Sequence, residues 1–319
     1  MTTIKTRLRV GVLLALLTAI STGISVAPAA AAPTAAEQPV FCNPLATEGA
    51  ATFSLFGGGS TAARGGDARE PDLGEVHAEL PASAKNKAGK NFRQTVPVWF
   101  HVVSDGAIGN ISGTVIQEQM NVLNLAFGGF YGGANTGFSF RLAGVTRTNN
   151  AAWHYAGIGG NDGNTMKQTL HRGGPETLNL YATTAGAYLG WAYLPDIVTK
   201  PGQAYLDGIV VDWESMPGAS TKYAGQYDLG QTATHEAGHW LNLEHTFYGG
   251  CNAKGDFIDD TPAQKVPTNG CPEGQDTCLK EPGLDPIHNY MDYSYDSCYW
   301  EFTQGQTQRM RDAWLLWRA

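Results

Sequence analysis

Three histidines lie within residues 235–245 at spacings that suit a metal ion, with Glu236 between the first two. The run reads His235-Glu236-Ala237-Gly238-His239-Trp240-Leu241-Asn242-Leu243-Glu244-His245. On a helix, side chains four residues apart share one face, so His235 and His239 can direct imidazole nitrogens at one ion. Zinc prefers such nitrogens in a tetrahedron. The spacing predicts a zinc site with His245 as the third ligand, provided that the chain turns back after the helix.

Asn242 is the residue at which we expect this turn. Helices often end through a residue in the left-handed conformation, and asparagine is among the few non-glycine residues that adopt it. Three protein ligands leave one zinc position open, as in catalytic rather than structural sites. Glu236 lies between two ligands, where it can act as the general base on the attacking water. The pattern therefore predicts zinc-dependent hydrolysis, in preference to histidines that only fill the core or the surface.

We predict a secreted zinc metalloendopeptidase and consider two other functions. A non-catalytic secreted binding protein that retains the fold would have no need of the base, so the intact Glu236 argues against it. A zinc hydrolase for small esters or amides would need a closed pocket rather than an open cleft. A glutamate as third zinc ligand is disfavoured, because His245 already has the required spacing.

The composition excludes some partners. The formal net charge of -8 argues against a nucleic-acid-binding protein, which needs a basic surface to displace counterions. Charged residues are few and glycines are many, which is typical of a globular domain rich in loops. We expect protein or peptide substrates and a monomer.

Hydrophobic periodicity predicts a mixture of strands and helices, which is an α+β fold. We expect strands at 95–103, 138–142, 178–181 and 208–212, an edge strand within 189–194, and helices at 114–127, 165–171, 231–244 and 303–317. Thr303 followed by Gln306 is a capping box for the last helix. The edge strand near 190–192 is suited to binding an extended peptide by strand addition.

The start of the chain predicts export. Lys5, Arg7 and Arg9 precede an apolar run at 10–20 and small residues that end at Ala32, so we assign residues 1–32 to a signal peptide. The alternative is a membrane anchor, but the apolar run is shorter than the ~20 residues of a spanning helix. Residues 33–90 have little periodic pattern and are assigned to a propeptide or linker. Residues 91–319 form the expected catalytic domain, which would be extracellular and free of the membrane after signal removal.

Four of the five cysteines lie in the last third of the chain, and Cys42 stands apart from them. In an oxidising compartment the four predict two disulfides, and their spacing leaves three pairings open. Cys42 is either a zymogen latch, whose thiolate occupies the fourth zinc position, or a cysteine without a function.

The zinc-site run resembles the metzincin signature, with Asn242 where most members carry glycine. Asn289-Tyr290-Met291-Asp292-Tyr293 resembles the metzincin Met-turn. The surrounding segments are similar to those of the pappalysin family over roughly 95–317. These segments are Leu178-Asn179-Leu180-Tyr181, Gly238-His239-Trp240-Leu241, His245-Thr246-Phe247, Asp260-Thr261-Pro262 and Phe302-Thr303-x-Gly305-Gln306.

The resemblance implies a metzincin-like zincin fold. An upper subdomain with a mixed sheet and two helices would meet an irregular lower subdomain at the zinc cleft. Met291 would form a hydrophobic floor beneath the metal, and Tyr293 would stabilise the tetrahedral intermediate. The implied disulfides are Cys251–Cys278 and Cys271–Cys298.

Two further sites are expected. Residues 255–261 contain clustered carboxylates and carbonyls suited to calcium, with Asp256, Asp260 and Thr261 as candidate ligands. The resemblance favours calcium, whereas a solvated acidic loop is the alternative. Asp296 is expected near the pocket for the residue after the scissile bond, where a carboxylate would favour arginine or lysine.

Overall fold

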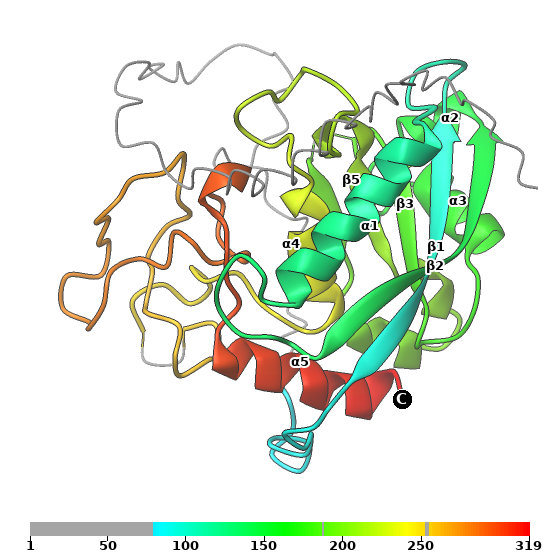
Figure 1. The fold of residues 1–319 in the computed structure, drawn as a ribbon. Coiled ribbons are helices and arrows are strands. Elements are labelled where there is room, and N and C mark those ends of the chain that lie inside the picture. Colours follow the sequence, from blue (N-terminus) through cyan, green and yellow to red (C-terminus); the bar gives the residue numbers. More distant parts are fainter. Residues whose placement is uncertain (1–78, 187, 253–254) are drawn as a thin grey trace, which may run out of the picture. The chain divides into compact units, whose positions relative to one another are not determined.

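The computed structural model describes residues 79–186, 188–252 and 255–319. Their fold is built on a five-stranded sheet with the strand order β2-β1-β3-β5-β4 (Figure 1). Only β4 runs antiparallel to its neighbour. The strands are β1 (Gln94–Ser104), β2 (Phe138–Asn149), β3 (Leu178–Thr183), β4 (Gly190–Ala192) and β5 (Ile209–Asp212). All five expected strands are present, and β2 is seven residues longer than predicted because its outer half is only partly buried.

The central strands read as continuous apolar runs because both of their faces are covered. Every residue of β3 and β5 is buried. The helices α1 (Gly113–Phe127) and α4 (Gln231–Trp240) pack on one face, and α3 (Asn161–Leu170) packs on the other. Figure 1 shows α1 crossing in front of the sheet. A short helix, α2 (Ala151–His154), was not predicted, because four residues give no periodic signal.

The helix that carries the zinc-site run ends four residues earlier than predicted. We expected it to extend to Glu244, but α4 ends at Trp240. The reason is Asn242, whose φ of 78° lies in the left-handed region and cannot continue a right-handed helix. The turn therefore falls at the predicted residue.

Between α4 and the last helix, the described residues (241–252 and 255–303) form turns and loops with one short 3₁₀ helix at Asp296–Cys298. Two disulfides, Cys251–Cys278 and Cys271–Cys298, connect these loops. The final helix, α5 (Gln304–Trp317), has the predicted capping box between Thr303 and Gln306. The described residues thus combine a mixed sheet, its helices and an irregular region, which confirms the expected α+β class.

Some predictions fall on residues that the structure does not describe. The signal peptide, residues 33–78 of the predicted propeptide, and Cys42 lie outside the described ranges. Residues 79–90 are described and contact α5, because Asp312 accepts backbone hydrogen bonds from Asn86, Lys87 and Ala88 at 2.6–2.8 Å. Within the described part of the chain, no helix has the length and apolar character needed to cross a membrane.

Candidate metal centre and catalytic cleft

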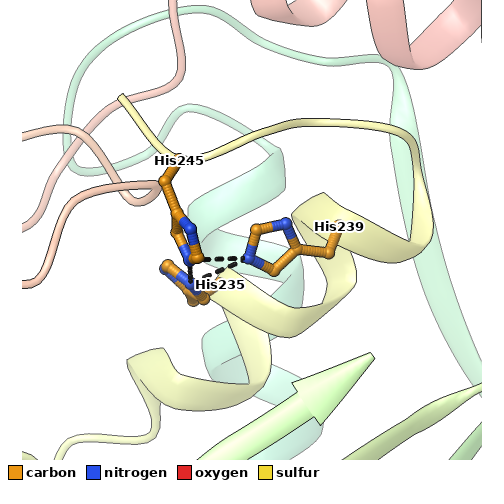
Figure 2. Close-up of side chains that lie close together, drawn as sticks. All are labelled: His235, His239 and His245. Atoms are coloured by element: carbon orange, nitrogen blue, oxygen red, sulfur yellow. Dashed lines mark hydrogen bonds between the residues drawn. The ribbon is translucent and has the colours of Figure 1, made fainter. Parts of the chain in front are cut away.

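The three histidines of the zinc-site run converge on one point. The Nε2 atom of His239 lies 3.0 Å from that of His235, and the His245 Nε2 lies 3.1 Å from each of the other two (Figure 2). Nitrogen ligands in a tetrahedron around zinc, each at about 2.0–2.1 Å, are separated by roughly 3.3–3.4 Å. The observed triangle is close to that size, so the three rings can share one ion.

The other ring nitrogens determine which tautomers are present. His235 Nδ1 donates to the carbonyl oxygen of Tyr290, and His239 Nδ1 donates to that of Leu243, each at 2.7 Å. A ring that donates through Nδ1 in its neutral form presents a lone pair at Nε2. Such lone pairs repel one another at about 3 Å unless a cation lies among them. The donor set therefore fits a zinc ion, and the carbonyls orient the rings that would hold it.

The turn after α4 brings His245 back to the other two histidines. Asn242 N–H donates to His239 O at 2.8 Å, and Leu243 N–H donates to Gly238 O at 3.0 Å. These two bonds around a left-handed residue form a Schellman motif. The motif reverses the chain at the position where the spacing of the histidines required it.

Glu236 points from α4 toward the edge strand β4. Its side chain is buried, and a Cβ atom on Gly190 would lie 2.7 Å from its Oε1 and 2.8 Å from its Cγ. Only a residue without a side chain leaves space for the glutamate at this point. Sequence reasoning did not identify Gly190 as a determinant of the cleft, because a glycine near an edge strand carries no chemical signal of its own.

The segment predicted to be the Met-turn, residues 289–293, lies against α4 and beside the histidines. Met291 is fully buried, and its thioether lies so close to α4 that a Cβ atom on Gly238 would overlap with Met291 Sδ. The ring of Tyr293 lies beside the triad, with its centroid 4.9 Å from that of His245 and 5.7 Å from that of His235. Both residues are therefore next to the candidate metal centre.

The Met-turn is held by the capping box of α5. The side-chain amides of Asn289 and Gln306 exchange two hydrogen bonds, at 2.8 and 2.9 Å. The same Gln306 Oε1 accepts from Thr303 N–H at 2.9 Å. The Asn289 Oδ1 also accepts from Met291 N–H at 3.0 Å. Sequence reasoning identified the capping box but not the two hydrogen bonds between Gln306 and Asn289.

Asp296 lies at the N-terminal end of α4. Its side chain is buried, and its Oδ2 accepts from Leu229 N–H at 3.0 Å and from Gln231 N–H at 3.2 Å. A carboxylate at this end also interacts favourably with the helix dipole. Asp296 therefore bonds to the helix that carries the candidate ligands.

The predicted calcium ligands line a common cavity of about 410 Å³. Asp256 is buried, and burial raises its pKa to about 7, although hydrogen bonds with Ile258 and Thr261 oppose the shift. Asp260 Oδ2 accepts from Gly305 N–H at the start of α5, at 2.9 Å. A buried carboxylate and an exposed one beside a common cavity are a suitable donor set for a hard cation.

Both disulfides that the resemblance implied are present. The Cα atoms are 5.5 Å apart in Cys251–Cys278 and 6.0 Å apart in Cys271–Cys298. The sequence spacing alone had left three pairings open. The second disulfide joins Cys298, two residues after Asp296, to the loop at 271.

Comparisons with known proteins agree with the geometry. Residues 216–314 match the model of the peptidase family described as Pregnancy-associated plasma protein-A. An extracellular metalloprotease of Arthroderma benhamiae is 44% identical over 230 residues, which cover 70% of this chain and 74% of the relative. An extracellular metalloprotease of Neurospora crassa is 42% identical over 78% of this chain and 84% of the relative.

Solved structures of mirolysin are similar in both fold and sequence. Mirolysin in complex with compound 9 has a TM-score of 0.60 and 31% identity, covering 69% of this chain and 91% of that chain. Mature mirolysin from Tannerella forsythia, in complex with a cleaved peptide, has a TM-score of 0.58 and 31% identity, covering 69% of this chain and 90% of that one. The fold and the site thus define a zinc metalloendopeptidase of the metzincin type. The chain belongs to the pappalysin family.

Proposed function

We propose that His235, His239 and His245 hold the catalytic zinc and that Glu236 is the general base of peptide hydrolysis. The convergence of the three Nε2 atoms at 3.0–3.1 Å carries this assignment. When bound, zinc lowers the pKa of a water molecule toward ~7 and polarises a scissile carbonyl. Glu236 takes a proton from the attacking water and delivers it to the leaving amine. The carbonyls of Tyr290 and Leu243 keep two of the rings in the tautomer that leaves Nε2 free to ligate.

The substrate binds as an extended strand along β4. In the pair of β4 with β5, Asp212 N–H donates to Leu189 O at 2.7 Å, and residues alternate along an antiparallel pair. The backbone groups of Gly190 and Ala192 consequently point away from β5, toward the outer edge of the sheet. An added strand would gain its affinity from these groups. Peptides with a single N-methyl group opposite Gly190 should be cleaved poorly, and uniform cleavage of an N-methyl series would contradict this binding mode.

Met291 and Tyr293 have separate roles at the metal site. The buried Met291 packs against α4 at Gly238 and forms the floor of the site. Tyr293, whose ring lies 4.9 Å from that of His245, stabilises the tetrahedral intermediate through its hydroxyl. A Tyr293→Phe variant should lose kcat while keeping its zinc. An unchanged kcat would remove this role.

Asp296 selects a basic residue after the scissile bond. Support comes from its position beside the start of α4 and from the preference of carboxylates for guanidinium and ammonium groups. Profiling with a peptide library tests it: cleavage without preference for arginine or lysine would overturn the assignment.

Asp256, Asp260 and Thr261 form a calcium site. The buried Asp256 and the acidic cavity that it lines support this assignment. Removing calcium with a selective chelator should lower the thermal midpoint of the wild type, whereas an Asp256→Asn variant should respond little. A wild-type midpoint that does not change would contradict the site.

The enzyme is a secreted, extracellular monomer made as a zymogen, with residues 1–32 as signal peptide and residues 33–90 as propeptide or linker. The extracellular relatives and a structure of promirolysin among the similar proteins support this proposal. Cys42 is the candidate latch. A Cys42→Ala precursor with the same latency as the wild type would rule out that role.

One pair of proteins tests the function as a whole. The wild type should cleave casein or gelatin and contain zinc, while Glu236→Ala should contain zinc without cleaving. Zinc in both without cleavage, even after removal of the propeptide, would favour the alternative of a non-catalytic secreted binding protein that retains the zincin fold.

A further inference from the structure

A cluster of buried charges lies at the C-terminal end of α4, and none of its members is a candidate metal ligand. It consists of Lys167 from α3, Asp207 just before β5, Trp240 at the end of α4, and Arg318 directly after α5; we call it the Asp207 cluster. The exposed fractions of the three charged residues are 0% for Lys167, 1% for Asp207 and 2% for Arg318. Charges at this depth are costly unless they are paired and hydrogen-bonded, so their contacts indicate what they stabilise.

Asp207 joins Arg318 to the last residue of the helix. Its Oδ2 accepts from Trp240 Nε1 at 3.1 Å and from Arg318 Nη1 at 3.0 Å, and its Oδ1 accepts from Arg318 Nη2 at 3.0 Å. The guanidinium also lies over the indole of Trp240, 3.6 Å from the ring centroid. The arginine is therefore fixed by a bidentate ion pair on one side and an aromatic face on the other.

Arg318 satisfies the one terminal carbonyl of α4 that the backbone does not. The carbonyls of Ala237, Gly238 and His239 accept from backbone N–H groups of the following turn. The carbonyl of Trp240 accepts from Arg318 Nε at 3.1 Å and from Arg318 Nη2 at 2.7 Å. A cation at this end also interacts favourably with the negative end of the helix dipole.

Lys167 fixes the segment that carries Asp207. Its Nζ donates to Leu206 O at 2.6 Å and to Gly208 O at 3.1 Å, the carbonyls on either side of the aspartate. Because both flanking peptides are held, the carboxylate of Asp207 has a fixed position. The cluster thereby connects α3, the start of β5 and the region after α5 to the end of the active-site helix.

We propose that Asp207 and Arg318 are positioning residues for His239, the second zinc ligand. Trp240 directly follows His239, so a helix end that is free to fray would let this imidazole move relative to the other two. Small displacements of a ligand weaken metal binding, and residues that orient ligands typically contribute ~10–100-fold in affinity. The inference rests on the zinc assignment proposed above and extends it to residues that touch neither the metal nor the substrate.

The test compares Arg318→Met, Arg318→Lys and Asp207→Asn with a matched control, Arg311→Met. Like Arg318, Arg311 is a buried arginine; it lies within α5, and its Nε donates to Thr136 O at 2.8 Å, away from α4. Zinc release to a chromogenic chelator is measured well below each unfolding transition. The visible spectrum of the cobalt(II)-substituted protein reports the ligand geometry.

Arg318→Met should release zinc about 10–100-fold faster than the wild type and alter the cobalt spectrum, with partial recovery in Arg318→Lys. Arg311→Met should lose stability with zinc release and spectrum unchanged. If Arg318→Met does not fold, Arg318→Lys and Asp207→Asn provide the same comparison. If all the variants of the cluster released zinc at the wild-type rate and had the wild-type cobalt spectrum, the positioning role would be overturned. The assignment of the zinc ligands would not be affected by that result. A His239→Ala protein that holds zinc as tightly as the wild type would instead overturn the ligand assignment beneath it.

Discussion

At the scale of single residues, the candidate site depends on two positions that carry no side chain. Gly190 leaves space for Glu236 beside β4, and Gly238 leaves space for Met291 beneath α4. In each case a Cβ atom would meet a side chain that is held between packed elements and has little freedom to move. The positions of Glu236, the proposed general base, and of Met291, the proposed floor of the site, therefore depend on the missing side chains of these two glycines.

Replacing Gly190 with alanine should displace Glu236 and leave the zinc ligands in place. We expect kcat to fall by about 10²-fold, because errors of ~1 Å in a catalytic group have effects of that size. Zinc content should change little. Gly89→Ala is the control, since no atom lies within 4 Å of its added Cβ. A Gly190→Ala enzyme with wild-type kcat would show that Glu236 is not confined by β4.

His101 should make stability depend on pH in the acidic range. It is fully buried, and burial lowers its pKa from 6.5 to about 4, although the hydrogen bond with Asn179 opposes the shift. The unfolded chain therefore binds more protons between these two values, so the contribution of His101 to stability is lost as the pH falls from 6.5 to 4. This loss amounts to about 3 kcal/mol at most.

Urea denaturation at several pH values checks the role of His101. The amide of a His101→Gln variant does not titrate, so its free energy of unfolding should fall less steeply than that of the wild type below pH 6.5. Titration of the other groups is common to both proteins and cancels in the comparison. Parallel curves for the two proteins would contradict the role given to this histidine.

At the scale of elements, periodicity and capping signals predicted most of the fold. The β-branched and aromatic run of β1, the spacing of apolar residues in α1 and the capping box of α5 depend on local sequence, and local sequence was enough to find them. The end of α4 was misplaced because its helical pattern continues to Glu244, while the left-handed Asn242 stops the helix. In a prediction of helix ends, a residue that favours the left-handed conformation should therefore count for more than the helical periodicity around it.

The residues of the candidate site also fall into those that local sequence predicted and those that it did not. The three histidines and Glu236 were predicted from their spacing, because His235, Glu236 and His239 depend on positions along one helix and His245 on the turn that follows it. The pair Asn289–Gln306 and the contact of Asp296 with the start of α4 were not recognised. They join residues far apart in the sequence, and only the tertiary packing selects such partners.

Gln306 should stabilise the Met-turn as well as the start of α5. Gln306→Ala removes two buried amide hydrogen bonds and leaves the side-chain N–H group of Asn289 without its acceptor, so we expect a loss of about 2–4 kcal/mol in the free energy of unfolding. Thr303→Ala removes only the cap and should cost about 1 kcal/mol. Chemical denaturation of both variants checks this. Equal losses would mean that the amide pair contributes nothing beyond the cap.

At the scale of the whole molecule, the described residues divide into a sheet with helices and an irregular region held by two disulfides. Each disulfide spans a sequence separation of 27 residues, for which chain entropy predicts roughly 3–4 kcal/mol of stabilisation. Their effects on activity should differ. Only Cys271–Cys298 lies beside the segment that contacts α4 through Asp296.

Paired alanine substitutions separate the two disulfides. Both pairs should lower the thermal midpoint, but replacing Cys271 and Cys298 should also reduce kcat/KM, while replacing Cys251 and Cys278 should reduce it much less. Kinetic assays at a temperature where all the variants are folded make the comparison. The same loss of kcat/KM in both would contradict a specific link between the second disulfide and the cleft.

The central claim is that three histidines hold one zinc ion, and anomalous diffraction at the zinc absorption edge tests it most directly. The account predicts a single strong peak about 2.0–2.1 Å from the Nε2 atoms of His235, His239 and His245, with Glu236 beside it. A peak bound by other residues, or active crystals without a peak at the histidines, would contradict it.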